Sequence, residues 1–249
     1  MTGKQHPHTP NYNINNLSTI RHVFCAQCIF LLTVLLHILV RRKNGTLLES
    51  DLDVCVDRVL DMVLTTTEKL KQEGGEADLE QHHIFAQKVA EEAVVLLEND
   101  GTLPLKSTAK VALIGRFAEE PRYQGAGSSQ VNAYKLDKIL DFKEDYKFDF
   151  VGYEPGFKFK NKISKGFEKK AIKLANKAEI IVVFVGLDSV TEAEGMDREN
   201  ILIPDSQLHL LNKIIELGKK VVVVLSSGSV VELPFAKKVN ALLHGYLPG

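Results

Sequence analysis

The chain has 249 residues, enough for one large domain or two small ones. With 45% hydrophobic and 25% charged residues, its composition is that of an ordinary globular protein. Its 31 basic and 32 acidic residues nearly cancel, which argues against a nucleic acid or another polyanion as partner. Three cysteines are too few for a disulfide framework, so no network of covalent cross-links is expected.

The first 43 residues differ in composition from the rest of the chain. Residues 1–20 are polar and show no period, so we expect them to be disordered. Residues 24–40 are almost wholly apolar, and basic residues flank them: Arg21 before, and Arg41, Arg42 and Lys43 after. This run is at the short limit for a membrane-spanning helix. Three interpretations remain open: a membrane anchor whose basic end faces the cytoplasm, a buried helix, or a segment foreign to the domain.

Residues 44–106 are predicted to be mainly helical. A capping pattern begins at Ser50, and apolar residues then recur at helical spacing over about four turns: Leu52, Val56, Val59 and Val63. Residues 66–77 are polar and contain glycine, which is typical of a linker. A second helix is predicted over residues 78–98, where the turn sequence at 99–101 ends it.

Residues 107–249 alternate between strand and helix patterns. The expected strands cover residues 110–115, 148–153, 180–186, 220–225 and 241–246, and the expected helices lie near 167–178 and 208–215. Residues 180–186 are apolar and largely β-branched, as in a central parallel strand that is covered on both faces. The alternation predicts an α/β fold with a mainly parallel, doubly wound sheet flanked by helices. Because the chain ends just after a strand, we expect a domain truncated at its C-terminus.

Two loops at the carboxyl ends of expected strands are candidate sites, since ligands bind at this edge of parallel sheets. The first loop, residues 122–129, contains a Gly-x-Gly pattern that could cradle a phosphate. That pattern lies about ten residues past the strand, and the chain has no Gly-x-x-x-x-Gly-Lys-Ser/Thr motif. Nucleotide binding, contact with another ligand and a merely flexible loop therefore all remain open for this segment.

The second loop, residues 186–198, collects acidic side chains. Four carboxylates lie within ten residues, with only Arg198 to balance them: Asp188, Glu192, Glu194 and Asp197. Mutual repulsion should raise the pKa of at least one of them, and a carboxyl group that stays protonated near neutral pH can act as a general acid. A divalent-metal site and a plain solvated loop are the alternatives.

Five motifs, in the same order, resemble those of glycoside hydrolase family 3, whose members include β-glucosidases. They are Glu91–Leu105, Gln124–Ser129, Glu194–Arg198 followed by Leu202, Pro204 and Gln207, then Val221–Gly228, and His244–Gly249. The resemblance implies that residues 107–249 form the family's C-terminal α/β sandwich. It also implies that residues 44–106 hold the last helix of a truncated (β/α)8 barrel, a linker and a connecting helix. Residues 1–43 have no counterpart in the family.

The resemblance also implies a function. Such an enzyme is a retaining, exo-acting β-glycosidase that removes terminal non-reducing β-linked sugars from a β-glucoside or oligosaccharide, without metal or other cofactor. An aspartate on the barrel is the nucleophile, and Glu194 is the acid/base. Gly195 lets the loop turn, while Asp197 and Arg198 support it as an internal ion pair. The other loop lines the sugar site through Gln124, Gly125, Gly127, Ser128 and Ser129.

This sequence departs from the family pattern in that it contains no tryptophan, which normally stands beside the nucleophile, and almost none of the barrel. We therefore expect an inactive fragment whose Glu194 points toward the missing barrel and has no strong partner. The alternative is a catalytically inactive carbohydrate-binding or interaction module, which residues 24–40 could tether to a membrane. A cytoplasmic location is expected, with membrane anchoring as the alternative.

Overall fold

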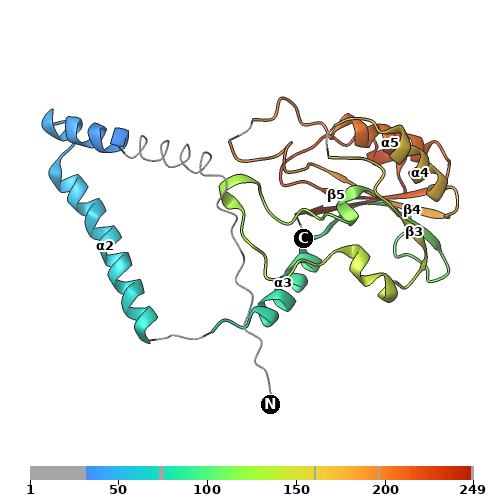
Figure 1. The fold of residues 1–249 in the computed structure, drawn as a ribbon, viewed down its shortest axis with the longest axis horizontal. Coiled ribbons are helices and arrows are strands. Elements are labelled where there is room, and N and C mark those ends of the chain that lie inside the picture. Colours follow the sequence, from blue (N-terminus) through green and yellow to red (C-terminus); the bar gives the residue numbers. More distant parts are fainter. Residues whose placement is uncertain (1–31, 73–75, 160, 196, 248–249) are drawn as a thin grey trace, which may run out of the picture. The chain divides into compact units, whose positions relative to one another are not determined.

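The computed structural model describes residues 32–72, 76–159, 161–195 and 197–247. The chain divides into two compact units, Met1–Glu76 and Ala77–Gly249 (Figure 1). The division falls inside the segment predicted as a linker. The expectations for residues 1–20 and for most of the apolar run at 24–40 lie outside the described residues.

The first unit is helical where it is described. Residues 32–43 are helical, and α2 (Glu49–Gln72) follows them. Acidic residues in the first turn of α2 and lysines in its last turn both suit the helix dipole. The prediction that residue 66 begins a linker was wrong, because Glu, Lys, Leu and Gln favour continuation of the helix to Gln72. Among the described residues, no helix has both the length and the apolar character needed to cross a bilayer.

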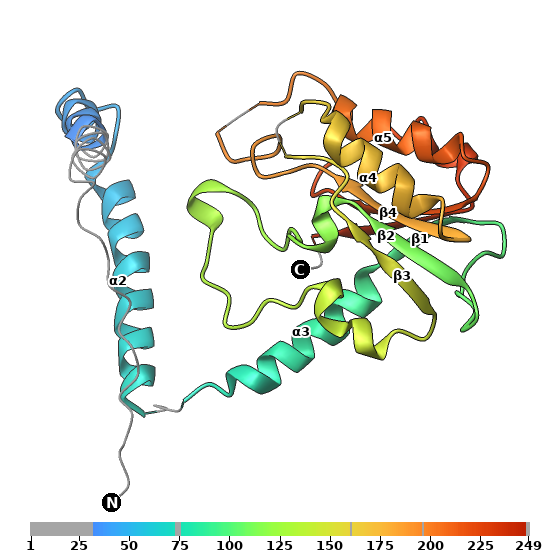
Figure 2. The same ribbon diagram turned by 45° about the vertical axis from the view of Figure 1, so that its right-hand side comes forward.

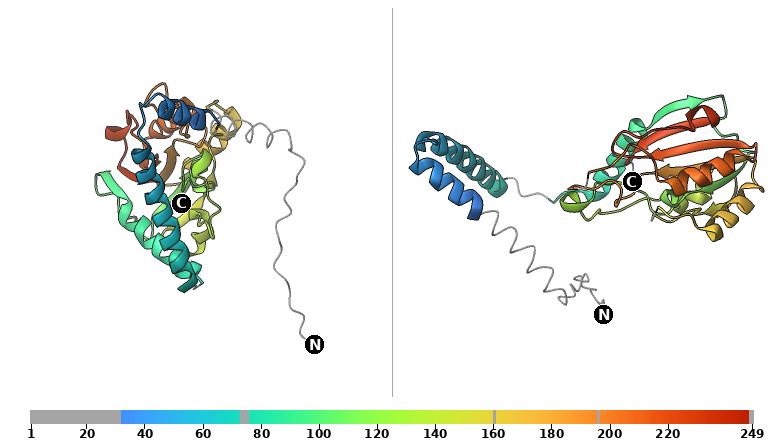
Figure 3. Two further views of the ribbon diagram at one scale, coloured as in Figure 1. Left: turned by 90° about the vertical axis from the view of Figure 1, so that its left-hand side faces the viewer. Right: turned by 90° about the horizontal axis from the view of Figure 1, so that it is seen from above.

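The second unit is built on a six-stranded sheet in the order β1-β6-β5-β4-β2-β3. Five neighbouring strands are parallel, and only β1 runs antiparallel, at the edge beside β6 (Figure 3). The predicted mainly parallel α/β sheet is therefore confirmed. The strands are β1 (Val95–Asn99), β2 (Lys110–Ile114), β3 (Asp149–Glu154), β4 (Ile180–Gly186), β5 (Lys220–Ser226) and β6 (Ala241–Tyr246).

Strand β1 corrects the sequence-based prediction. The helix predicted over residues 78–98 ends earlier, as α3 (Leu79–Ala93), and residues 95–99 pair with β6 instead. The apolar run Val94–Leu97 suits a strand, and pairing with β6 outweighs the continued helical period. The Asn99 side chain then accepts hydrogen bonds from the backbone N–H groups of Gly101 and Leu103, both at 3.1 Å, and so shapes the predicted turn.

Helices pack on the sheet from both sides. In Figure 2, α4 (Lys165–Ala175) and α5 (Asp205–Ile215) lie against one side, and α3 lies on the other. Gly218, with a φ of +69°, follows α5 in the left-handed conformation predicted for a residue that ends a helix. Short 3-10 turns occupy the connections: Arg116–Ala118, Gly127–Ser129, Ile139–Asp145 and Ala236–Lys238.

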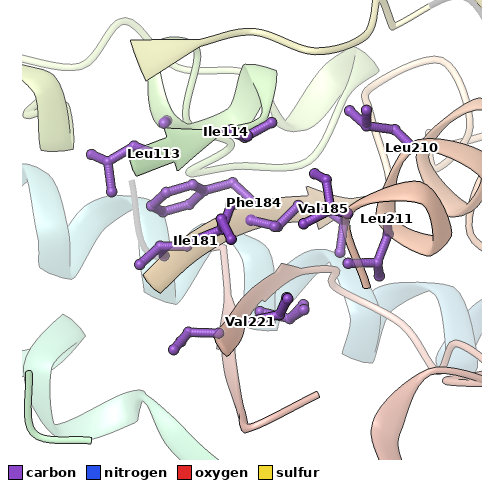
Figure 4. Packing of buried hydrophobic residues seen from close by; sticks show 14 of the residues in the cluster. Leu113, Ile114, Ile181, Phe184, Val185, Leu210, Leu211 and Val221 are labelled. Atoms are coloured by element: carbon purple, nitrogen blue, oxygen red, sulfur yellow. The ribbon is translucent and has the colours of Figure 1, made fainter. Parts of the chain in front are cut away.

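The core comprises buried side chains on both faces of the sheet. Side chains from β2, β4, β5 and α5 belong to it, among them Leu113, Ile181, Leu211 and Val221 (Figure 4). At Gly186 the strands β4 and β5 approach so closely that a Cβ atom would lie 1.9 Å from the Ser226 carbonyl oxygen. The core thus fixes the carboxyl ends of the central strands, from which the candidate loops emerge.

Candidate active site

Three loops meet at the carboxyl edge of the sheet. They follow β2, β4 and β5, and because β4 pairs with both other strands, its loop lies between theirs. We call residues 187–198 the acid loop. The acid loop starts from a fixed point, because Gln207 of α5 clamps Gly186: the amide accepts from Gly186 N–H and donates to Gly186 C=O, both at 2.9 Å. Leu187 N–H also donates to the Ser226 carbonyl oxygen at 2.9 Å.

Asp188 shapes the start of the acid loop. Its side chain is buried, and Oδ1 accepts hydrogen bonds from Val190 N–H at 3.1 Å and from the N–H and hydroxyl of Thr191, both at 2.7 Å. This arrangement is an Asx turn. Asp188 is therefore occupied in holding the backbone and presents little of its carboxylate to a ligand.

Glu192 is held as a carboxylate. It accepts hydrogen bonds from Arg122 Nη1, from the Ser229 hydroxyl and, at 3.0 Å, from Gly228 N–H. Burial acts to raise the pKa of Glu192, but the hydrogen bonds from Ser229, Gly228 and Arg122, with the charge of Arg122, hold it below its ordinary value. For Glu192 the pKa therefore moves opposite to the rise predicted from carboxylate repulsion, and this residue is unsuited to be a general acid.

Glu194 lies at the exposed part of the acid loop. Gly195 beside it has a φ of +76°, the left-handed conformation that lets the chain turn there, as predicted. The Ser128 hydroxyl donates a hydrogen bond to Glu194 Oε2. The expectation that Glu194 has no strong partner was wrong, because the loop after β2 reaches across to it.

Arg198 and Asp197, the two residues predicted to support the loop, differ in the contacts that they make. Arg198 Nη1 donates to the Ser229 hydroxyl at 2.8 Å and to the Val230 carbonyl oxygen at 3.1 Å. Asp197 is exposed, and no salt bridge between Asp197 and Arg198 occurs in the described part of the chain. Arg198 thus ties the acid loop to the loop after β5 and not to its neighbour in sequence.

The first candidate loop, residues 122–129, which we call the Gly/Ser loop, divides into two parts. Gly127, with a φ of +86°, and Ser128 lie next to Glu194: a Cβ atom on Gly127 would be 3.5 Å from the Glu194 side chain. Gln124 instead holds its own loop, donating to the Tyr123 hydroxyl at 2.8 Å and accepting from Val131 N–H at 2.9 Å. Ser129 belongs to the 3-10 turn Gly127–Ser129, and its side chain lies outside what the structure describes.

A hollow of about 200 Å³ lies beside this loop. Gln124 and Gly125 line it, together with aromatic and charged side chains that include Phe117, Arg122 and Asp188. Glu194 lies outside its lining. The predicted site residues are therefore distributed between this hollow and the exposed part of the acid loop.

Sequence reasoning assigned no role to Arg122, Ser229 or Gln207 in holding these loops. A buried cation near an acidic cluster could have been suspected, because such clusters need compensation. However, Arg122 precedes Glu192 by 70 residues, so only the sheet topology shows that the two meet. Ser229 lies beyond the next strand and carries no signal of its own.

The chain resembles several known proteins. The sequence model of the Glycosyl hydrolase family 3 C-terminal domain matches residues 94–249. Thermostable beta-glucosidase B of Acetivibrio thermocellus is 38% identical over 211 residues, covering 83% of this chain and 28% of that protein. An exo-alpha-(1->6)-L-arabinopyranosidase of Bifidobacterium longum is 32% identical over 221 residues, covering 83% of this chain and 29% of that protein.

A solved structure agrees with these relatives. The crystal structure of a family 3 beta-glucosidase from Bifidobacterium adolescentis matches with a TM-score of 0.75 and 34% identity, covering 86% of this chain and 32% of that one. The chain thus spans less than a third of the length of each of these proteins. The chain belongs to glycosyl hydrolase family 3, and residues 94–249 correspond to that family's C-terminal domain.

Proposed function

We propose that this chain supplies the acid/base glutamate, Glu194, of a retaining exo-acting glycosidase of the β-glucosidase type. The nucleophile would come from a (β/α)8 barrel that these 249 residues do not contain. Support for the activity comes from the relatives, which include a β-glucosidase and an arabinopyranosidase, both hydrolases of glycosidic bonds. The substrate would be a terminal non-reducing sugar, with the glucoside as the first compound to test.

One observation carries the assignment to Glu194. Of the four carboxylates in the acid loop, Asp188 and Glu192 accept hydrogen bonds from the protein's own backbone and side chains. Glu194 and Asp197 are exposed, but among the described contacts only Glu194 sits beside a left-handed glycine and accepts a hydrogen bond from the Gly/Ser loop. Glu194 is thus both presented to an approaching substrate and held in place by Ser128.

The proposed reaction requires two proton transfers by the Glu194 carboxyl group. Glu194 gives its proton to the leaving oxygen while the nucleophile attacks the anomeric carbon, and it later takes a proton from water. In retaining glycosidases the two carboxyl groups lie about 5–5.5 Å apart. The Ser128 hydroxyl would orient the carboxylate between these steps, because it donates a hydrogen bond to Glu194 Oε2.

A chimera tests this proposal directly. Residues 94–249 would replace the matching segment of the Acetivibrio thermocellus enzyme, and the chimera would be compared with its Glu194→Gln variant. The variant should lose about 10²–10⁴-fold in kcat on a substrate with a poor leaving group, such as cellobiose. The loss should be much smaller on 2,4-dinitrophenyl β-glucoside, whose leaving group needs little protonation. Azide should partly rescue Glu194→Ala, because this anion attacks the glycosyl-enzyme without a general base.

Asp197→Asn is the matched control, since Asp197 is the other exposed carboxylate of the loop. Equal losses on both substrates in Glu194→Gln, with no rescue by azide, would contradict the assignment. Rescue of an Asp197→Ala variant would move the acid/base role to that residue. A folded chimera that binds glucose but never turns over would favour the alternative, a catalytically inactive carbohydrate-binding or interaction module.

A further inference from the structure

Four side chains from three loops form one continuous polar network. Arg122, from the loop after β2, donates through Nη1 to a Glu192 carboxylate oxygen and to the Leu187 carbonyl at 3.2 Å. Its Nη2 donates to the Glu192 carbonyl at 2.8 Å. Glu192 in turn accepts from the Ser229 hydroxyl, and Ser229 accepts from Arg198. The network therefore runs from Arg122 through Glu192 and Ser229 to Arg198.

This network grips the acid loop on both sides of Glu194. Glu192 lies two residues before Glu194 and Arg198 four residues after it, and both bind the same hydroxyl, that of Ser229. Among the described residues, none of 193–195 or 197–200 makes a backbone–backbone hydrogen bond. The position of this stretch therefore depends on its two gripped ends and on Ser128.

We propose that Arg122, Glu192 and Ser229 are positioning residues that fix the stretch Ala193–Gly195, which we call the arch, and with it Glu194. Whether the arch carries an acid/base rests on the proposed function, but the anchoring itself does not. The sequence presents Glu192 and Glu194 as two similar acids, whereas the contacts give them different tasks. Glu192 holds the arch, whereas Glu194 is exposed and contacts Ser128, which leaves it free for the role proposed above.

Burial makes this anchor different from a surface ion pair. The side chains of Arg122 and Glu192 are only 8% and 18% exposed. Removing one partner of such a pair leaves the other charge buried and uncompensated, which is far more disruptive than loss of an exposed pair. Arg116 and Glu120 provide the contrast in a neighbouring segment, because their i,i+4 pair is 28% and 45% exposed and spans only one turn.

The backbone order of the arch in the 249-residue chain tests the proposal without any enzyme assay. The ¹⁵N order parameters of Ala193 and Gly195 should be close to about 0.85 in the wild type and fall below about 0.6 in Glu192→Gln. Amides of β4 should keep their values, which separates loss of the anchor from general loosening. Glu120→Gln is the matched control, since it makes the same change in the exposed pair and should leave the arch unchanged.

Ser229→Ala is the second variant, in case Glu192→Gln does not fold. It removes the hydroxyl that joins the two ends and should also lower the Gly195 order parameter. Unchanged order at Ala193 and Gly195 in both variants would overturn the anchoring, whatever the chimera does. Ser128→Ala is a third variant. If the order parameters fell only in this variant, the proposal would also be overturned, because the arch would then depend on Ser128 alone.

The chimera adds a chemical test. Glu192→Gln should lower kcat on cellobiose at least tenfold with little change in KM, and azide should not restore it, because Glu194 is still present as the base. Rescue of Glu192→Ala by azide would make Glu192 the acid/base and overturn the proposal. If the chimera itself were inactive, the proposed function would fail, while the order parameters would still decide the anchoring.

Discussion

Helices α5 and α2 carry similar apolar patterns with opposite outcomes. In α5, Leu211 is 1% exposed and belongs to the core of the second unit. In α2, Leu60 is 50% exposed, and most of the other large apolar side chains of that helix are exposed as well, with Leu52 partly buried. A periodic pattern therefore identifies which side chains favour burial, but it does not show whether the surface that would bury them lies in the same stretch of chain. The second unit has its own core, and α2 gains nothing comparable from the described residues around it.

The largest effect is expected from a single methyl group in that core. Gly186→Ala places a Cβ atom 1.9 Å from the Ser226 carbonyl oxygen, so β4 and β5 would have to separate. The expected loss of unfolding free energy exceeds about 4 kcal/mol, which is a large fraction of the roughly 5–15 kcal/mol that stabilises a typical domain. Near-UV circular dichroism of the tyrosines measures this, because all of them except Tyr12 lie in the second unit.

Gly166→Ala is the control for this change. Gly166 lies in α4 with no atom within 4 Å of an added Cβ, so alanine there should be neutral or stabilise the helix by up to about 1 kcal/mol. Equal stability of the Gly186 and Gly166 variants would show that the close approach of β4 and β5 is not what holds this edge of the sheet.

The difference between helices α5 and α2 can be tested by making the same leucine-to-alanine change in each and measuring the free energy of unfolding. Leu211→Ala should cost about 2–5 kcal/mol of unfolding free energy in urea, because it opens a cavity in the core. Leu60→Ala should change that free energy by less than about 0.5 kcal/mol, since its side chain is half exposed and alanine favours a helix. A large cost for Leu60→Ala would mean that α2 stabilises the second unit after all.

The fold was largely predictable from the sequence, and particular residues show why. The apolar run at 180–186 and the alternation around it identified the parallel sheet, since burial on both faces leaves a clear pattern. The antiparallel strand β1 was missed because Val94–Leu97 continues the helical period of α3, and only its partner β6, far along the chain, decides the outcome. Sequence periodicity carries no information about such distant pairing.

The loops that carry the candidate residues were predictable from the sequence, but the contacts that these residues make were not. Glu192 and Glu194 are two residues apart and chemically alike, so no local rule separates them. What separates them is contact with Arg122 and Ser229, which come from other strands. The expected ion pair between Asp197 and Arg198 was wrong for the same reason: Arg198 donates its hydrogen bonds to residues of the loop after β5.

A pH-dependent effect should appear on acidification. The pKa of Glu192 is lowered in the folded chain, so the carboxylate contributes stability above the ordinary glutamate pKa of about 4.3 and loses that contribution as pH falls through the folded value. The wild type should therefore be more stable than Glu192→Gln at pH 7, and the difference should shrink toward zero below the folded pKa. Urea midpoints from pH 7 down to pH 3 measure the change.

Glu120→Gln should stay close to the wild type at pH 7, since an exposed pair contributes less than about 1 kcal/mol. A gap between the wild type and Glu192→Gln that widens on acidification would contradict the ion-paired state of Glu192. The test therefore depends on whether the stability difference between the wild type and Glu192→Gln shrinks or widens as pH falls.

The pairing of β1 with β6 also bears on how this domain is synthesised. Residue Val95 lies opposite His244, roughly 150 residues later, so the first strand of the sheet cannot find its neighbour until almost the whole domain has left the ribosome. Contacts this distant in sequence slow folding, because a long loop must close before they form. Until then, Leu96 and Leu97 remain unpaired, and an unpaired strand edge of this kind is prone to pair with other chains.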